Sequence, residues 1–135
     1  MKRAFAFSML LALLLLTACA GGKSQNPLAG SDWNLVTLSG TAPLEGTTLT
    51  LTFGTDQVGG NAGCNSFGGK YVVEGDQLTT SELASTLMAC VETGVMEQES
   101  AYLNALGAAQ SFSLKGSELR ILSAEGVELV FARQQ

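Results

Sequence analysis

The chain has 135 residues, and its 12 acidic residues outnumber its 7 basic ones, which gives a formal net charge of −5 at pH 7. An acidic chain without basic runs argues against nucleic acid, whose phosphates are bound by Lys and Arg, and against adhesion to anionic lipid. The sequence contains no histidine, the commonest general base and zinc ligand. We therefore expect no enzyme, no metal and no cofactor.

Residues 1–18 are typical of a secretory signal peptide. Met1-Lys2-Arg3 is a charged start, and an apolar stretch over residues 4–16 follows. The stretch is shorter than the roughly 20 apolar residues that a permanent helix needs to cross a hydrocarbon core of about 30 Å. Residues 1–18 contain Lys2 and Arg3 but no acidic residue, so their removal changes the formal charge from −5 to −7.

The end of the apolar stretch, Leu16-Thr17-Ala18-Cys19, resembles the lipobox of bacterial lipoproteins, in which the cysteine is acylated and becomes the first mature residue. We expect Cys19 to carry several fatty-acyl chains such as palmitate, which give stable anchoring where one chain gives only marginal binding. Ala20 stands where lipoproteins kept in the inner membrane of enteric bacteria often have Asp. The resemblance therefore implies the outer membrane, facing the periplasm, in a Gram-negative host. The alternative is an ordinary signal peptide followed by an incidental cysteine.

Residues 19–30 are small and polar and are interrupted by Pro27, which suits a flexible tether. We expect one domain over residues 31–133, because about a hundred residues suffice for one core and hardly for two. With Cys19 committed to lipid, Cys64 and Cys90 remain as a pair in an oxidising compartment, and we expect a disulfide. Two free thiols or a redox pair are the alternatives, although no C-x-x-C is present.

Alternation of polar and apolar residues predicts β-strands along most of the domain. The clearest strand is 48–53, in which Leu49, Leu51 and Phe53 would face the core. The other predicted strands are 32–38 with Trp33 as an anchor, 67–73 with its hairpin partner 77–80, and a C-terminal meander of 112–114, 119–122 and 127–131.

Helical spacing of apolar residues appears once, over residues 93–108, with Thr93 or Gly94 as the cap. Sequential hairpins around one helix predict a mostly β, α+β fold, because a flat antiparallel sheet would leave reactive edges. We expect an antiparallel, partly closed β-barrel with one packed α-helix.

The run of residues 58–71 is rich in glycine. Its glycines permit positive φ or close backbone approach, and Asn61 and Asn65 tolerate left-handed conformations, so the run predicts a sharp turn or bulge. A phosphate cradle is the functional alternative. It lacks the Gly-Lys-Ser/Thr ending, since Gly63 is followed by Cys64, and β structure rather than a helix follows.

Five further side chains invite a functional reading. Phe67 and Tyr71 are four residues apart and would share one face of a strand as core aromatics, with ligand stacking as the alternative. We expect Glu92, Glu97 and Glu99 on a solvated helix face, where they complement the helix dipole. An acid pair or a calcium site is the alternative there, and the loop pattern of an EF-hand is absent.

The pattern Gly-Cys-Asn-x-Phe-x-Gly-x-Tyr over residues 63–71, followed by Thr86-Leu87-Met88-Ala89-Cys90 and an acidic amphipathic helix, resembles the signature of the META domain family. HslJ-like bacterial heat-shock lipoproteins belong to that family, and the likeness spans roughly residues 28–131. The matched family residues are Gly63, Cys64, Asn65, Phe67, Gly69, Tyr71, Met88 and Cys90. The resemblance implies a compact antiparallel β fold with one helix, and links to heat stress, novobiocin tolerance and secretion-related virulence. It implies no catalytic residues.

We therefore expect a non-enzymatic envelope lipoprotein, a monomer held to the membrane through Cys19, with a binding or stress-tolerance role. Its expected partner is an envelope protein or a small apolar ligand. One alternative is a tethered assembly factor, a pilot or chaperone for a secreted or outer-membrane protein. Others are a small-ligand carrier, or an enzyme using Asp or Glu with Ser or Tyr. A filled barrel would favour a protein partner, and a wide apolar mouth a ligand.

Overall fold

The computed structural model describes residues 25–135; the expected signal peptide, Cys19 and residues 20–24 of the expected tether lie outside them. Within this range the chain forms eight strands and one helix. The strands are β1 (Ser31–Leu38), β2 (Thr50–Phe53), β3 (Gln57–Asn61), β4 (Ser66–Glu74), β5 (Gln77–Ser85), β6 (Ala109–Lys115), β7 (Glu118–Ser123) and β8 (Glu128–Arg133). The helix α1 (Val95–Gly107) stands between β5 and β6, and no described helix is long and apolar enough to cross a membrane.

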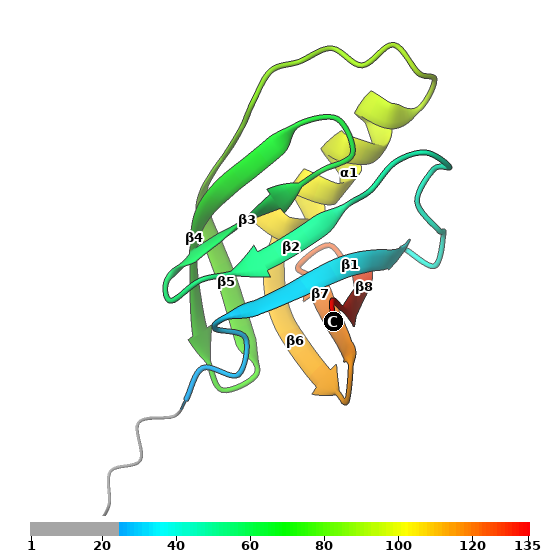
Figure 1. Cartoon of the computed structure of the whole chain (residues 1–135). Helices are drawn as coiled ribbons and strands as arrows, with labels where there is room; N and C mark the ends of the chain where they lie inside the picture. Colours follow the sequence, from blue (N-terminus) through cyan, green and yellow to red (C-terminus); the bar gives the residue numbers. More distant parts are fainter. Residues whose placement is uncertain (1–24) are drawn as a thin grey trace, which may run out of the picture.

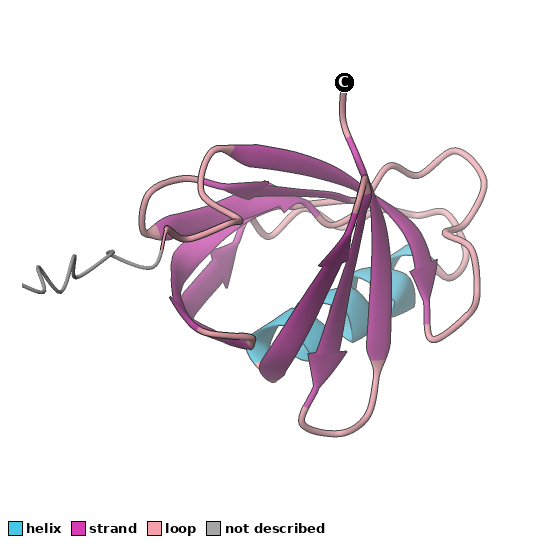
Figure 2. Ribbon diagram, turned by 90° about the horizontal axis from the view of Figure 1, so that it is seen from below, coloured by secondary structure: helices cyan, strands magenta, loops and turns pink. Residues whose placement is uncertain are grey.

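The strands form a closed antiparallel barrel in which neighbours in sequence pair and β8 returns to β1 (Figure 1). Helix α1 lies along one side of the curled strands (Figure 2). The predicted antiparallel barrel with one packed helix is confirmed. Closure is thinnest between β5 and β6, where the register contains one pair, Gln77 with Ser111. The helix supports this seam, because Thr80 Oγ1 of β5 donates to the carbonyl oxygen of Leu106 at 2.6 Å.

Side chains fill the interior of the barrel. Alternate residues of the strands point inward, as in β1, where Ser31, Trp33 and Leu35 are buried between exposed neighbours. Helix α1 adds Tyr102, whose ring lies edge-on to Phe67 with 5.8 Å between ring centroids. The largest fully buried side chains are Trp33, Tyr102, Phe53 and Phe131. Because strands from all sides and the helix contribute to one buried cluster, the interior is a packed core.

The glycine-rich run forms strand β3 over Gln57–Asn61, where a sharp turn or bulge was predicted. The reason is close packing between backbones. A Cβ placed on Gly60 would lie 2.1 Å from the carbonyl oxygen of Thr50, so a larger residue would push β3 away from β2. The chain turns later, at Gly63, which has a positive φ of 108°. The run thus contains both a strand and a turn.

The start of the folded structure lies a few residues before the expected boundary at residue 31. Leu28 is fully buried in the core cluster. The Asn26 side-chain amide donates to the Tyr71 hydroxyl at 2.8 Å, and the Ser31 hydroxyl donates to the carbonyl oxygen of Leu28. Trp33 Nε1 donates to the Ser31 hydroxyl at 2.7 Å. Residues 26–30 therefore pack on the barrel, although their composition suits a tether, because Leu28 occupies a core position.

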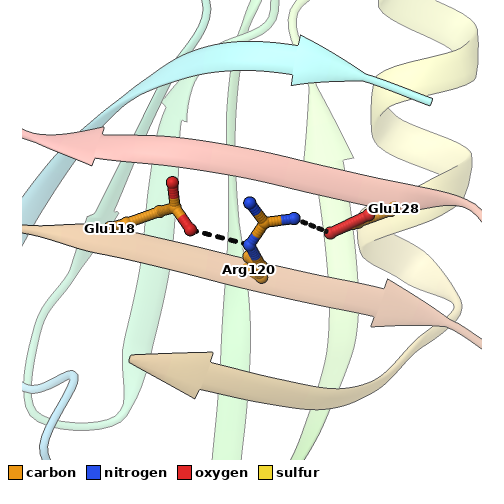
Figure 3. A network of polar contacts seen from close by, with 3 residues as sticks. All are labelled: Glu118, Arg120 and Glu128. Carbon is orange, nitrogen blue, oxygen red and sulfur yellow. Dashed lines mark hydrogen bonds and ion pairs between the residues drawn. The ribbon is translucent and has the colours of Figure 1, made fainter. Parts of the chain in front are cut away.

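A polar network on the outside of the barrel joins the last two strands. Arg120 lies between Glu118 and Glu128, with 2.7 Å from its Nε to Glu118 and 2.6 Å from its Nη1 to Glu128 (Figure 3). The hydrogen bond to Glu118, followed by that to Glu128, raises the pKa of Arg120. Exposed ion pairs of this kind contribute little to stability. The network links neighbouring side chains of β7 and β8 on the outer face of the barrel.

Both tyrosines of the chain make the folded state sensitive to alkaline pH. Burial raises the pKa of Tyr102 well above its usual value. Burial also raises the pKa of Tyr71, with a further increase from Asp56 and an opposing effect of the Asn26 hydrogen bond. An unfolded tyrosine loses its proton near pH 10. Above that pH the unfolded chain binds fewer protons than the folded one, so stability falls as pH rises.

We expect the urea midpoint to change little between neutral pH and about pH 9 and to fall above about pH 10. Tyrosinate absorbance should rise only together with the loss of β-sheet circular dichroism. In Tyr102→Phe, the urea midpoint should fall less steeply as the pH rises above about 10. The substitution should also lower the unfolding free energy by about 1 kcal/mol at neutral pH, because the Tyr102 hydroxyl donates to the carbonyl oxygen of Thr50 at 2.9 Å. Free titration of both tyrosines in the folded protein would contradict this prediction.

Candidate functional site

The signature segments meet at the start of the loop that joins β5 to α1, over residues 86–94, which we call the β5–α1 loop. The disulfide between Cys64 and Cys90 ties this loop to the turn that follows β3, with a Cα–Cα distance of 6.0 Å. The predicted disulfide is confirmed. The backbone N–H of Thr86 also donates to the carbonyl oxygen of Ser66 at 3.0 Å. The loop is thus fixed to β4 at its start and to the turn near its end.

Asn65 is the centre of the contacts between turn and loop. Its side-chain Nδ2 donates to the carbonyl oxygen of Met88 at 3.0 Å and to Glu99 Oε1 at 2.7 Å. Its Oδ1 accepts from the Met88 N–H at 2.7 Å and from the Thr86 hydroxyl at 2.8 Å. An asparagine amide offers two donors and two acceptor positions, and all four are used. Asn65 is 1% exposed and pairs with Met88 as a neighbouring strand would.

Glu99 supports Asn65 from the helix. Its Oε2 accepts the backbone N–H groups of Cys64 at 3.2 Å and Asn65 at 2.6 Å. The residue is 5% exposed, so the expectation of a solvated Glu99 is wrong. No ion pair among residues 25–135 includes Glu99, and donors from the turn surround its carboxylate instead. Buried polar groups are tolerated when they are hydrogen-bonded in this way.

The helix pattern contained a signal for the burial of Glu99. The helix buries Val95, Tyr102 and Leu106. Glu99 lies on the same face, because it follows Val95 by four residues and precedes Tyr102 by three. Glu97 is exposed in the first turn, as expected for a residue that complements the helix dipole. The helix begins at Val95, after Gly94 in a left-handed conformation with φ 85° and without a side-chain cap.

The remaining signature residues serve the turn and the core. The Gly63 N–H donates to the Asn61 side chain at 2.8 Å. Phe67 and Tyr71 are both buried, and Tyr71 lies edge-on to Phe53 with 4.9 Å between ring centroids. A Cβ on Gly69 would lie 2.6 Å from Leu83 Cδ2 and 2.7 Å from the carbonyl oxygen of Ser81, next to the register shift in the β4–β5 pairing. Phe67, Gly69 and Tyr71 thus act in packing, whereas Gly63, Asn65 and Met88 belong to the loop attachment.

The outer side of the β5–α1 loop carries exposed apolar side chains. Leu87 is 95% exposed and Val91 is 92% exposed, and the side chain of Met88 is also exposed. In Figure 1 this loop lies at the far end of the molecule from the point where the described chain begins. Its backbone is held while its apolar side chains face solvent. In the sequence, Leu87 and Met88 appeared only as part of the family signature, and nothing in the pattern indicated that their side chains are exposed.

An open groove of about 890 Å³ runs beside the helix. Leu83 of β5, Ala101 and Leu103 of α1, and Leu38 and Val127 from the adjoining strand ends contribute to its lining. Among residues 25–135, no group of three or more His, Cys, Asp or Glu side chains could hold a metal ion. Among residues 25–135, the groove and the β5–α1 loop both expose apolar side chains outside the core.

The fold and the attached loop define a class of small closed β-barrels with one helix and a disulfide that attaches the β5–α1 loop. The chain belongs to the META domain family, whose model matches residues 26–135. An NMR structure of a protein from Burkholderia xenovorans is similar at 28% identity and a TM-score of 0.67, covering 80% of this chain and 84% of that one. A crystal structure of a DUF4847 family protein from Bacteroides vulgatus shares the fold at 12% identity and a TM-score of 0.60, covering 80% and 96%. No curated protein matches the chain.

Proposed function

We propose that this protein is a non-enzymatic envelope lipoprotein, anchored through Cys19, that binds another protein on its outer surface and contributes to stress tolerance. The single observation that carries the binding mode is the filled barrel. Trp33, Tyr102 and Phe131 occupy the interior, so a ligand carried there would have to displace core side chains. Outside the barrel, the groove and the β5–α1 loop offer described apolar surface for recognition.

A tethered assembly factor is the second candidate, and the groove beside α1 favours it. Grooves lined by leucine and alanine side chains accept the apolar face of a helix or an extended segment. Leu83, Leu103 and Val127 supply such a lining. In that case, loss of the protein mislocalises one client of the envelope, whereas a general binding role weakens stress tolerance without a single mislocalised protein.

The anchor is tested by intact-mass analysis of the protein purified from membranes. We expect a mature chain that begins at Cys19 and carries acyl chains, and we expect Cys19→Ala to abolish both the acyl mass and the membrane association. Cys64→Ala serves as the matched cysteine control and should leave the acyl mass unchanged. A mature chain that still begins at Met1 would overturn the proposed location.

Surface binding is tested with a photo-crosslinking residue in the native envelope. Ala101 is exposed and lines the groove, and Thr55 in the β2–β3 turn is exposed away from it. We expect position 101 to yield a reproducible protein adduct that position 55 does not yield. Absence of a reproducible adduct at position 101 and on the β5–α1 loop would contradict a surface-binding function.

A further inference from the structure

The β5–α1 loop combines two properties that seldom occur together. Leu87 and Val91 are 95% and 92% exposed, although each has a large apolar side chain. Single exposed apolar residues are ordinary on protein surfaces, but apolar side chains gathered on one short segment mark interaction sites. Met88 adds a third exposed apolar side chain between them. A partner that buried Leu87 and Val91 would remove nearly all of their surface from water.

The loop is also held in shape before any partner arrives. Asn65 fixes both backbone polar groups of Met88, and the disulfide fixes Cys90. Leu87 and Val91 therefore flank two attached residues, and their backbone positions are determined by the fold. A binding segment that is already ordered loses less conformational entropy on association. The buried polar contacts and the exposed apolar side chains thus have one explanation, the presentation of a rigid apolar projection.

The charges around the loop indicate the chemistry of the partner. Glu92 in the loop and Glu97 in the first turn of α1 are exposed, and residues 86–107 contain no Lys or Arg. Charge complementarity across interfaces favours a partner with basic residues at the rim of the contact. The same acidic side chains disfavour an anionic lipid surface and disfavour contact between two copies of this loop.

The position of the loop indicates where the partner lies. The described chain begins at one end of the barrel, and the β5–α1 loop lies at the other end (Figure 1). If the protein is anchored through Cys19, the chain leads toward its anchor from the end of the barrel opposite the loop. This step rests on the proposed function. It favours a protein in the compartment that the barrel faces over the membrane that holds the anchor.

We propose that the β5–α1 loop is the docking element, and that Leu87 and Val91 insert into an apolar concavity with a basic rim on a partner protein. The partner's basic rim contacts Glu92 and Glu97. Asn65, Glu99 and the disulfide act as positioning groups that hold the loop for this contact.

The first experiment places a photo-crosslinking residue at position 87 of the full-length protein in the native envelope. Position 72 is the matched control, because Val72 is an apolar side chain that is 57% exposed on β4. We expect mass spectrometry to identify one protein adduct at position 87 that is absent at position 72. A lipid adduct, a dimer of this chain, the same adduct at both positions, or no adduct overturns the docking role. If position 101 in the groove then still captures a protein, surface binding stands and only the loop proposal fails.

The second experiment measures binding of the full-length protein in detergent to the protein that position 87 captures. We expect L87S/V91S to weaken binding by about tenfold or more, as is typical when central apolar contacts are removed. V72S should change it by less than about twofold. E92K should also weaken binding, most strongly at low salt. Equal affinities for L87S/V91S and V72S, with both variants folded by circular dichroism, overturn the proposal.

Discussion

We expect the Cys64→Ala, Cys90→Ala double variant to lose about 3.5 kcal/mol of unfolding free energy. The two cysteines are separated by 26 residues, and a crosslink over that distance restricts the unfolded chain by this amount in the chain-entropy model. Cys64 is buried, so alanine is preferred over serine because it adds no hydroxyl to a buried position. The loss is a large part of the stability of a small domain. Urea denaturation followed by circular dichroism measures it.

The slope of the urea transition provides an internal check. An unfolded chain without the crosslink exposes more surface, so the m-value of the double variant should exceed that of the oxidised wild type. Reduced wild-type protein is the matched control and should behave as the double variant does. A double variant within about 1 kcal/mol of the oxidised protein would show that the disulfide holds only the loop and does not restrict the unfolded state.

The barrel was predictable because most of its strands alternate. Residues 48–53 indicated which side chains face the core, and Leu49, Leu51 and Phe53 are buried there. Strand β3 was missed for a physical reason. Gly59 and Gly60 have no side chains, so the strand shows no alternation, and its glycines serve the approach of neighbouring backbones. That approach is a tertiary property that the local pattern does not contain.

The candidate site was predictable in part. The cysteine count indicated the disulfide, which joins the turn containing Asn65 to the loop containing Met88. The four contacts of the Asn65 side chain were not predictable, because they depend on the path of the loop between β5 and the helix. The helical spacing placed Glu99 on the apolar face of the helix. Because its side chain is charged, we nevertheless expected it to be solvated. The neighbours that satisfy that charge come from a distant segment.

Glu99→Ala should cost about 3 kcal/mol of unfolding free energy, and Glu99→Gln about 2 kcal/mol, because hydrogen bonds to a buried carboxylate contribute more than those between neutral groups. Alanine leaves the backbone N–H groups of Cys64 and Asn65 without their acceptor. Glutamine keeps the shape but replaces one acceptor oxygen with a donor that faces other donors. Urea denaturation at constant pH measures both losses.

Glu97→Gln is the matched control, because Glu97 lies in the same helix and is exposed. It should change the unfolding free energy by less than about 0.5 kcal/mol. A double-mutant cycle with Asn65→Ala isolates the contact between the two side chains, whose single losses should not add, since Asn65 Nδ2 donates to Glu99 Oε1 at 2.7 Å. If Glu99→Gln costs no more than Glu97→Gln, the carboxylate does not stabilise the turn. The loop that carries Leu87 and Val91 would then depend on the disulfide, on Asn65 and on the backbone hydrogen bond from Thr86 to Ser66.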